Sequence, residues 1–181
     1  YGIRCYDRHI LVSEAKARGM YDELENFFSE KPMDSLLYSI AMNYSRPKKK
    51  PFPFELVEEL AAEKPCIIIG RCADYALAEN PNLLSLFISA PLEDRIARVA
   101  KRQKVTPEEA KSLIQKTDKR RASYCEYYAS KKWGAVDAYD FCLNSSALGL
   151  GGTVELIQAM VAHKEHPIPS PTEIDPTQTE A

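Results

Sequence analysis

The spacing of apolar residues along the chain predicts four strands separated by helices. Short apolar runs at Ile3–Tyr6, Cys66–Ile69, Leu84–Ile88 and Tyr139–Leu143 each end at polar or turn-forming residues. We expect the last three to be strands buried on both faces and the first to be a shorter strand. The stretches between them carry apolar residues at helical spacing. This alternation predicts an α/β fold in which helices cover both faces of a parallel sheet.

Three of the expected helices have start signals. Thr106–Glu109 has the pattern of a capping box with proline at the first helical position, and the apolar spacing after it continues toward Tyr124. A second helix is expected to open at Pro91–Asp94, where acidic side chains complement the helix dipole. Thr153 is expected to cap the last helix.

The chain of 181 residues is long enough for one domain with a small mobile flap. We place this domain at residues 1–162, with a helical lid at about residues 100–132. Residues 163–181 are rich in proline and acids and are expected to form a flexible tail. The basic, proline-punctuated run Arg46–Pro53 is interpreted either as a surface loop or as a point where residues were left out and the ends joined.

The formal net charge of −2 hides a basic region between Leu92 and Arg121. That region holds ten Lys and Arg residues against five acids, a local charge of about +5. A basic block in a nearly neutral protein favours a small polyanion such as a nucleotide over a long nucleic acid. The alternative is a solvated helix face laced with ion pairs.

The five cysteines are scattered and contain no C-x-x-C pair. This pattern favours free thiols in a reducing compartment, so we expect a cytoplasmic protein without a metal site. The apolar runs are too short to cross a bilayer, and no signal-peptide pattern opens the chain, so we expect no membrane association.

Charged residues follow the ends of the predicted strands, where ligands bind in open parallel sheets. Gly70–Arg71 is the sharpest case, because glycine permits a tight turn and arginine then offers a planar fork for a phosphate or a base edge. The alternative is a structural glycine beside an arginine paired with a nearby acid. Asp118 and Arg121 share one helix face and could address one ligand, or they could form an ordinary ion pair.

The runs Ile67–Asp74, Phe87–Arg98, Asp118–Arg121 and Tyr139–Ile157 together resemble the cytidylate kinases, and most closely the bacterial cytidylate kinase-like branch. The resemblance spans roughly Tyr1 to Val161. It implies a three-layer P-loop kinase fold with a helical lid. It also implies a kinase that moves a phosphoryl group from ATP, with Mg²⁺, to a nucleoside monophosphate. We expect small-molecule nucleotides to be the partners and the protein to be a monomer or homodimer.

The resemblance also implies residue roles. Asp7 matches the aspartate at the entrance to the monophosphate site, and Arg71 matches the arginine that contacts the acceptor. Arg95 matches the arginine that lies against adenine, with Arg98 directed toward the phosphates. Asp118 and Arg121 match the pair that binds the acceptor and helps to close the lid. The resemblance places Ser145, Ser146 and Ala147 near the adenine.

Two positions depart from the cytidylate kinase pattern. The aspartate of Gly-Arg-Asp is Cys72 here, and the nearest acid, Asp74, is the candidate that replaces it. An arginine expected four residues before Asp118 is Ile114. Both positions concern the acceptor. The acceptor is therefore left open between CMP, another nucleoside monophosphate and another small molecule. The alternative to an enzyme is a non-catalytic protein that binds nucleotides and has a regulatory role.

No G-x-x-x-x-G-K-[ST] motif occurs in the chain. Phosphoryl transfer needs a glycine-rich loop to cradle the phosphates. In the family this loop follows the central strand, and a sheet without that strand would leave two neighbours with unpaired backbone groups. We therefore expect a first strand and a P-loop upstream of Tyr1.

Overall fold

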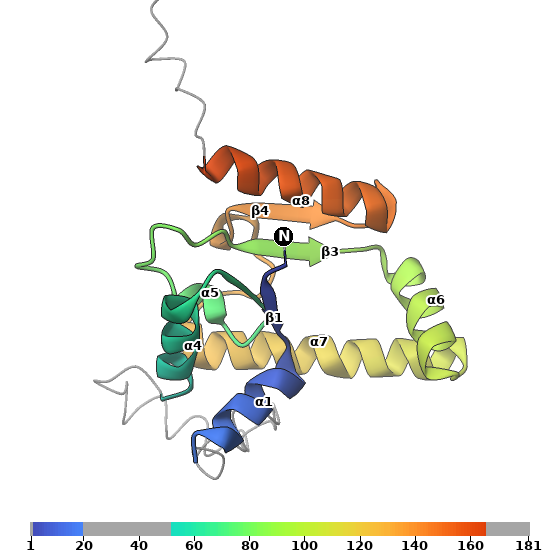
Figure 1. Cartoon of the computed structure of the whole chain (residues 1–181). Helices are drawn as coiled ribbons and strands as arrows, with labels where there is room; N and C mark the ends of the chain where they lie inside the picture. The colour runs from blue at the N-terminus through green and yellow to red at the C-terminus, as the bar shows by residue number, and fades with distance from the viewer. Residues whose placement is uncertain (1, 20–51, 166–181) are drawn as a thin grey trace, which may run out of the picture.

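The computed structural model of the chain describes residues 2–19 and 52–165. The elements in chain order are β1 (Arg4–Tyr6), α1 (Arg8–Ala17), α4 (Phe52–Glu63), β2 (Cys66–Ile68), α5 (Ala73–Ala76), β3 (Leu86–Ser89), α6 (Leu92–Gln103), α7 (Pro107–Ala129), the 3-10 turn η1 (Val136–Ala138), β4 (Phe141–Asn144) and α8 (Gly149–Glu165) (Figure 1). Strands and helices are mixed along the chain, as the α/β prediction requires.

The four predicted strands are present and pair in parallel. β1 lies against β2 with Arg4 opposite Cys66, and β3 lies against β4 with Leu86 opposite Phe141. Within the described residues these are two separate two-stranded sheets. The parallel pairing is therefore confirmed. The described residues do not form the single continuous sheet of a three-layer fold.

The prediction that the strands are buried on both faces is wrong. Ile67 in β2 is 49% exposed and Ile88 in β3 is 52% exposed, and Phe141 in β4 is also exposed. Each of the four strands has one edge without a neighbouring strand in the described part of the chain. The side chains project from the faces of the sheets, and these three stay in contact with solvent because burial needs covering elements that the periodicity of one segment does not supply.

Local signals at the helix ends gave mixed results. The α7 capping box is confirmed: the Thr106 amide donates to the Glu109 carboxylate at 2.8 Å, and the Glu109 amide donates to Thr106 Oγ1 at 3.2 Å. The helix start after Pro91 is confirmed as well. The prediction for Thr153 is wrong, because α8 already begins at Gly149 and Thr153 Oγ1 donates to the Gly149 carbonyl at 2.6 Å within the helix.

Two predicted irregular regions lie mainly outside the described residues. Helix α8 continues to Glu165, so the expected tail is helical over its first three residues, and residues 166–181 are not described. Of the run Arg46–Pro53, only Phe52 and Pro53 are described, as the start of α4. No helix in the described ranges is long and apolar enough to span a membrane.

The main core lies among α1, α4, α5 and the C-terminal half of α7. Its largest fully buried side chains are Phe54, Leu11, Leu56, Leu60 and Val57. A second, smaller cluster of Ile96, Ala110 and Ile114 joins α6 to the N-terminal half of α7. Figure 1 shows α6 and this half of α7 projecting away from the main core. Helix α7 therefore takes part in both clusters.

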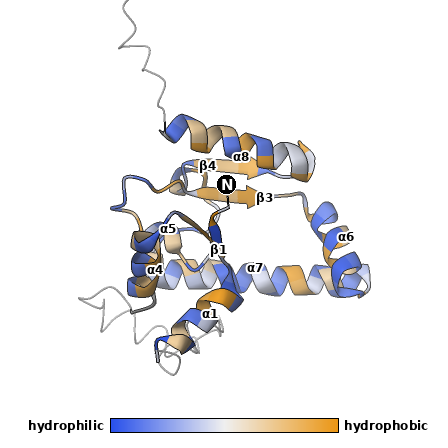
Figure 2. Cartoon of the chain, in the orientation of Figure 1, coloured by the Kyte–Doolittle hydropathy of each residue, from blue (hydrophilic) through white to orange (hydrophobic). Residues whose placement is uncertain are grey.

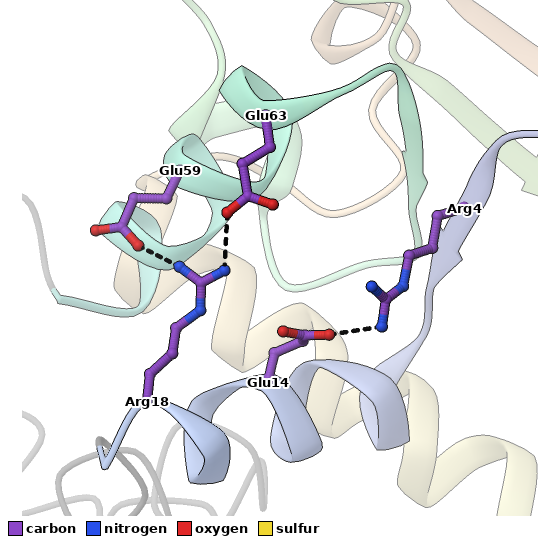
Figure 3. A network of polar contacts seen from close by, with 5 residues as sticks. All are labelled: Arg4, Glu14, Arg18, Glu59 and Glu63. Atoms are coloured by element: carbon purple, nitrogen blue, oxygen red, sulfur yellow. Dashed lines mark hydrogen bonds and ion pairs between the residues drawn. The ribbon is translucent and has the colours of Figure 1, made fainter.

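Ion pairs join the outer elements of the main core (Figure 3). Arg18, which follows α1, contacts Glu59 at 2.6 Å and Glu63 at 3.1 Å on α4. Arg4 of β1 contacts Glu14 of α1 at 2.6 Å. The partners are mostly solvent-exposed, so each pair adds on the order of 0–1 kcal/mol and mainly fixes orientation.

Candidate functional site

The loop after β2 has an unusual backbone. Gly70, Arg71 and Cys72 follow one another with φ angles of 75°, 62° and 51°, all in the left-handed region. Glycine adopts this region freely, but arginine and cysteine are sterically strained in it. Such strain persists only where surrounding contacts hold the backbone, and it concentrates at functional sites. The predicted turn at Gly70 is thus present and extends over two further residues.

Arg71 points toward α7. Its side chain is buried, with 8% of the residue exposed, and its guanidinium carbon lies 5.9 Å from the centre of the Tyr124 ring. A guanidinium on an aromatic face keeps its charge and its planar donor fork. Arg71 is therefore held in a defined place behind the carboxyl end of β2.

Cys72 turns into the main core. Its thiol hydrogen-bonds with that of Cys125 on α7, and both cysteines belong to the buried cluster around Phe54. A side chain in this position offers nothing to a ligand on the surface of the loop. The cysteine that replaces the family's aspartate has become part of the packing between the loop and α7.

Asp74 is paired with a residue that the sequence interpretation missed. Its carboxylate forms an ion pair with Lys131, which lies two residues after the end of α7. Lys131 Nζ also donates to the Ala138 carbonyl at 3.0 Å and lies 4.3 Å from the centre of the Tyr139 ring. Burial, followed by the nearby Asp74 charge, raises the pKa of Tyr139 to about 12. In the sequence Lys131 stands beside Lys132, and nothing local distinguishes it from a solvated surface lysine.

Arg95 and Asp118 are brought together. Arg95 of α6 donates to the Asp118 carboxylate of α7 at 2.7 Å, and this hydrogen bond raises the pKa of Arg95. The resemblance assigned these residues to adenine and to the acceptor, whereas the structure pairs them with each other across the α6–α7 hairpin. Arg98 and Arg121 are exposed on the same two helices.

Asp7 acts as a helix cap in this structure. Its side chain accepts a hydrogen bond from the Ile10 amide at 2.9 Å at the start of α1. A carboxylate at this place satisfies one of the free amides of the first turn and complements the helix dipole. One carboxylate oxygen is engaged, and the group remains at the carboxyl end of β1.

The loop after β4 is tied to the end of β3. Ser145 is buried, and both its amide and its hydroxyl donate to the Ser89 carbonyl, at 2.9 and 3.0 Å. The Ser146 amide donates to Asn144 Oδ1 at 3.0 Å. The Ser145 hydroxyl is therefore used within the fold, and the turn presents Ser146 and Ala147 at its outer side.

The candidate residues thus form two groups along α7. Arg71 and Asp74 lie beside its C-terminal half, and Arg95 is bound to Asp118 nearer its N-terminus. Asp118 and Tyr124 are separated by about 9 Å along the helix axis, at 1.5 Å per residue. No group of three His, Cys, Asp or Glu side chains that could hold a metal occurs in the described residues.

Comparisons with known proteins show what the chain is similar to. A sequence model of the cytidylate kinase-like family matches residues 1–147. A cytidylate kinase of Methanopyrus kandleri is 32% identical over 112 residues, which are 57% of this chain and 58% of that relative. The match therefore spans little more than half of the relative's length. A crystal structure of an uncharacterised protein from Eubacterium ventriosum superposes with a TM-score of 0.67 at 28% identity, covering 90% of this chain and 85% of the other.

Proposed function

This chain belongs to the cytidylate kinase-like family, and we propose that it transfers a phosphoryl group from ATP to a nucleoside monophosphate. The observation that carries the proposal is the buried Arg71 on a strained left-handed loop at the carboxyl end of β2. Strain of this kind, about 1–3 kcal/mol for each residue, is retained where a precise side-chain position is needed.

In this proposal Arg71 binds the phosphate of the acceptor. Its planar fork can donate two parallel hydrogen bonds to phosphate oxygens, and its low exposure strengthens them. Phosphoryl transfer requires little covalent chemistry from the protein, so positioning and charge neutralisation supply most of the rate enhancement. Asp7, at the end of the neighbouring strand, lines the entrance to the same site.

The α6–α7 hairpin, which overlaps the predicted lid at about residues 100–132, is proposed as the lid that binds ATP. Arg95 is held by Asp118, and the phosphates of a bound nucleotide would compete with that carboxylate for the guanidinium. Arg98 and Arg121 add exposed positive charge on the same helices. Ser146 and Ala147 are proposed to lie beside the adenine.

The described residues do not by themselves form a site for Mg²⁺. Asp74 is paired with Lys131, Asp118 is paired with Arg95, and no third carboxylate joins either of them in the described ranges. Mg²⁺ in phosphoryl-transfer enzymes takes several ligands from substrate phosphates and water, and few from the protein.

We propose that a further strand, carrying the phosphate-binding loop, lies between β2 and β3. Both strands are paired on one side only, and their side chains Ile67 and Ile88 are exposed. A parallel strand at this place would satisfy the unpaired backbone groups of both edges. It would also join the two sheets into the single sheet that the family resemblance implies.

A kinase acting on another small acceptor is the second candidate, and two side chains favour it. Cys72 faces the core, and Ile114 is buried between α6 and α7. Neither side chain can replace the corresponding groups, because an aspartate carboxylate would accept hydrogen bonds from CMP and an arginine would donate them. The family fold and lid could therefore serve an acceptor other than CMP. The five free thiols favour a cytoplasmic location for either activity.

The test is acceptor binding and turnover by the full-length protein. ATP consumption is measured with a panel of nucleoside monophosphates, and acceptor affinity is measured by calorimetry. Arg71→Ala is expected to weaken acceptor binding by about 10- to 100-fold, because a charged hydrogen bond is worth roughly 1.5–3 kcal/mol. Arg102→Ala, which removes an exposed arginine at the end of α6, is the matched control and should leave affinity unchanged.

The outcomes separate the candidates. Turnover with a nucleoside monophosphate supports the leading proposal, and turnover only with other hydroxyl or phosphate acceptors supports the second. Nucleotide-dependent stabilisation of the protein without any turnover would contradict both and identify a nucleotide-binding regulator.

A further inference from the structure

The Arg71 loop is fastened to α7 at two successive residues. Arg71 lies over the Tyr124 ring, and the next residue, Cys72, hydrogen-bonds with Cys125, the next residue of α7. The ion pair between Asp74 and Lys131 adds a third contact just beyond the helix. These contacts place two thiols from distant parts of the sequence in one buried pocket, where their positions are fixed by their neighbours.

The two thiols are chemically different. The Cys72 thiol donates to the Cys125 sulfur, which lowers the pKa of Cys125, and the positive charge of Lys131 acts in the same direction. The same hydrogen bond, together with burial, raises the pKa of Cys72. Cys125 is therefore the sulfur that more readily becomes a thiolate, which is the reactive form of cysteine, while Cys72 keeps its proton.

We propose that Cys72 and Cys125 form a reversible disulfide that fixes the Arg71 loop to α7 and lowers acceptor binding. The oxidant is a small peroxide. The Cys125 thiolate attacks one peroxide oxygen, the O–O bond breaks, and hydroxide leaves to give a sulfenic acid. The Cys72 sulfur then attacks the sulfenic sulfur, the S–S bond forms, and water leaves. In sum two thiols and one hydrogen peroxide give one disulfide and two waters.

Burial selects this pair and limits its rate. Cys72 is 7% exposed and Cys125 is 2% exposed, so a peroxide reaches them only when the loop opens locally. The strain stored at Arg71 and Cys72 favours such openings. Cys5 and Cys142 are exposed on separate strands and serve as internal reference thiols.

The consequence for binding follows from bond length, and this step rests on the proposed function. A disulfide has an S–S distance of about 2.05 Å, shorter than any hydrogen-bonded contact between thiols, so closing it draws the loop and the helix together. Arg71 is the residue next to Cys72 and must move with it. A displacement of about 1 Å at a positioning residue can cost on the order of 100-fold in rate.

The first experiment measures the crosslink without any nucleotide. The full-length protein is titrated with hydrogen peroxide and then digested without reduction. A peptide that joins the Cys72 and Cys125 segments, with a mass lower by two hydrogen atoms and sensitive to dithiothreitol, is expected. Cys125→Ala should abolish it, and Cys142→Ala should leave it unchanged. Oxidation of Cys5 and Cys142 while Cys72 and Cys125 remain unlinked would overturn the proposal.

The second experiment follows the loop and the site in the oxidised and reduced wild-type protein. Hydrogen exchange of the backbone amides at residues 70–77 should slow by about tenfold or more on oxidation if the loop is fixed. Acceptor affinity should fall by about tenfold or more and recover on reduction. Unchanged hydrogen exchange at the loop, or a crosslink that leaves acceptor affinity unchanged, contradicts the proposal that the disulfide regulates binding. A reduced protein that binds no nucleotide contradicts the proposed function instead, and the crosslink and exchange results remain readable in that case.

Discussion

The half of the molecule around β1 and β2 differs from the half around β3 and β4 in how completely it is packed. Around β1 and β2 the side chains of α1, α4, α5 and α7 form a continuous core in which Phe54 is 0% exposed. Around β3 and β4 the buried side chains are Ser145 and Thr153, which are both polar. The apolar Val154 on α8 is 54% exposed. Figure 2 shows that β3 and β4 are nevertheless hydrophobic in composition.

The difference shows which half of the described chain buries its own apolar side chains. Apolar residues that are exposed in one half and buried in the other have similar chemistry, so it is the supply of covering elements that differs. The two halves meet at Phe87 of β3, whose ring packs against Trp133 at 5.3 Å and Tyr139 at 5.2 Å. The second half is thus attached to the more completely packed first half and keeps apolar side chains exposed.

The largest expected effect is the loss of Phe54. Phe54→Ala should lower the free energy of unfolding by about 3–5 kcal/mol, because it leaves a cavity in the core. Val154→Ala on the exposed face of α8 should change it by less than about 0.5 kcal/mol. Urea unfolding followed by the fluorescence of Trp133 measures both. A cost at Val154 as large as that at Phe54 would break the comparison, since it would mean that this face is covered in solution.

A smaller effect is expected at the contact between the halves. Gly134 has a φ of 76°, and an added Cβ would lie 2.8 Å from Phe87 Cζ. Gly134→Ala should therefore cost about 1–3 kcal/mol through strain and overpacking. Gly151→Ala, where nothing lies within 4 Å, is the control and should be neutral or slightly stabilising in a helix. Equal thermal stability of the two variants would show that the Phe87 contact does not hold the halves together.

The ion pair beneath the Arg71 loop should matter less again. Lys131→Met removes the partner of Asp74 and should cost about 1–2 kcal/mol, with faster hydrogen exchange in the loop. Lys132→Met changes the neighbouring exposed lysine and is the matched control. If both variants exchange like the wild type, the ion pair does not position the loop.

The sequence predicts an interaction well when the interacting residues are close together in the chain, and poorly when they are far apart. The capping box at Thr106 was predicted because both of its partners lie within four residues. The burial of the strands was predicted wrongly, because burial depends on neighbours from distant parts of the chain. The pairing of Arg95 with Asp118 was missed because the two residues are 23 positions apart and each was assigned to a ligand. Lys131 was missed for the same reason, since its partner Asp74 is 57 positions away.

The smallest expected effect is a loss of stability in strong alkali. Burial raises the pKa of Tyr128, in the packed half, to about 12 from an ordinary 10.0. The unfolded chain therefore loses this proton first, so the contribution of Tyr128 is complete below pH 10 and is lost as the pH rises toward 12. The urea midpoint should fall between about pH 9 and about pH 11, and the fall should be smaller in Tyr128→Phe. An identical fall in this variant would assign the effect to other groups.

Helix α7 has a mechanical consequence. It runs for 23 residues without an internal proline or glycine, a length of about 35 Å. The N-terminal half of α7 lies in the hairpin with α6, Asp118 at the middle of α7 binds Arg95, and the C-terminal half carries Tyr124 and Cys125 beneath the Arg71 loop. A straight rod without a hinge acts as a lever, so a tilt imposed at the hairpin must appear as a displacement at the loop. The spacing between Arg95 and Arg71 is then set by the one helix that both of them contact.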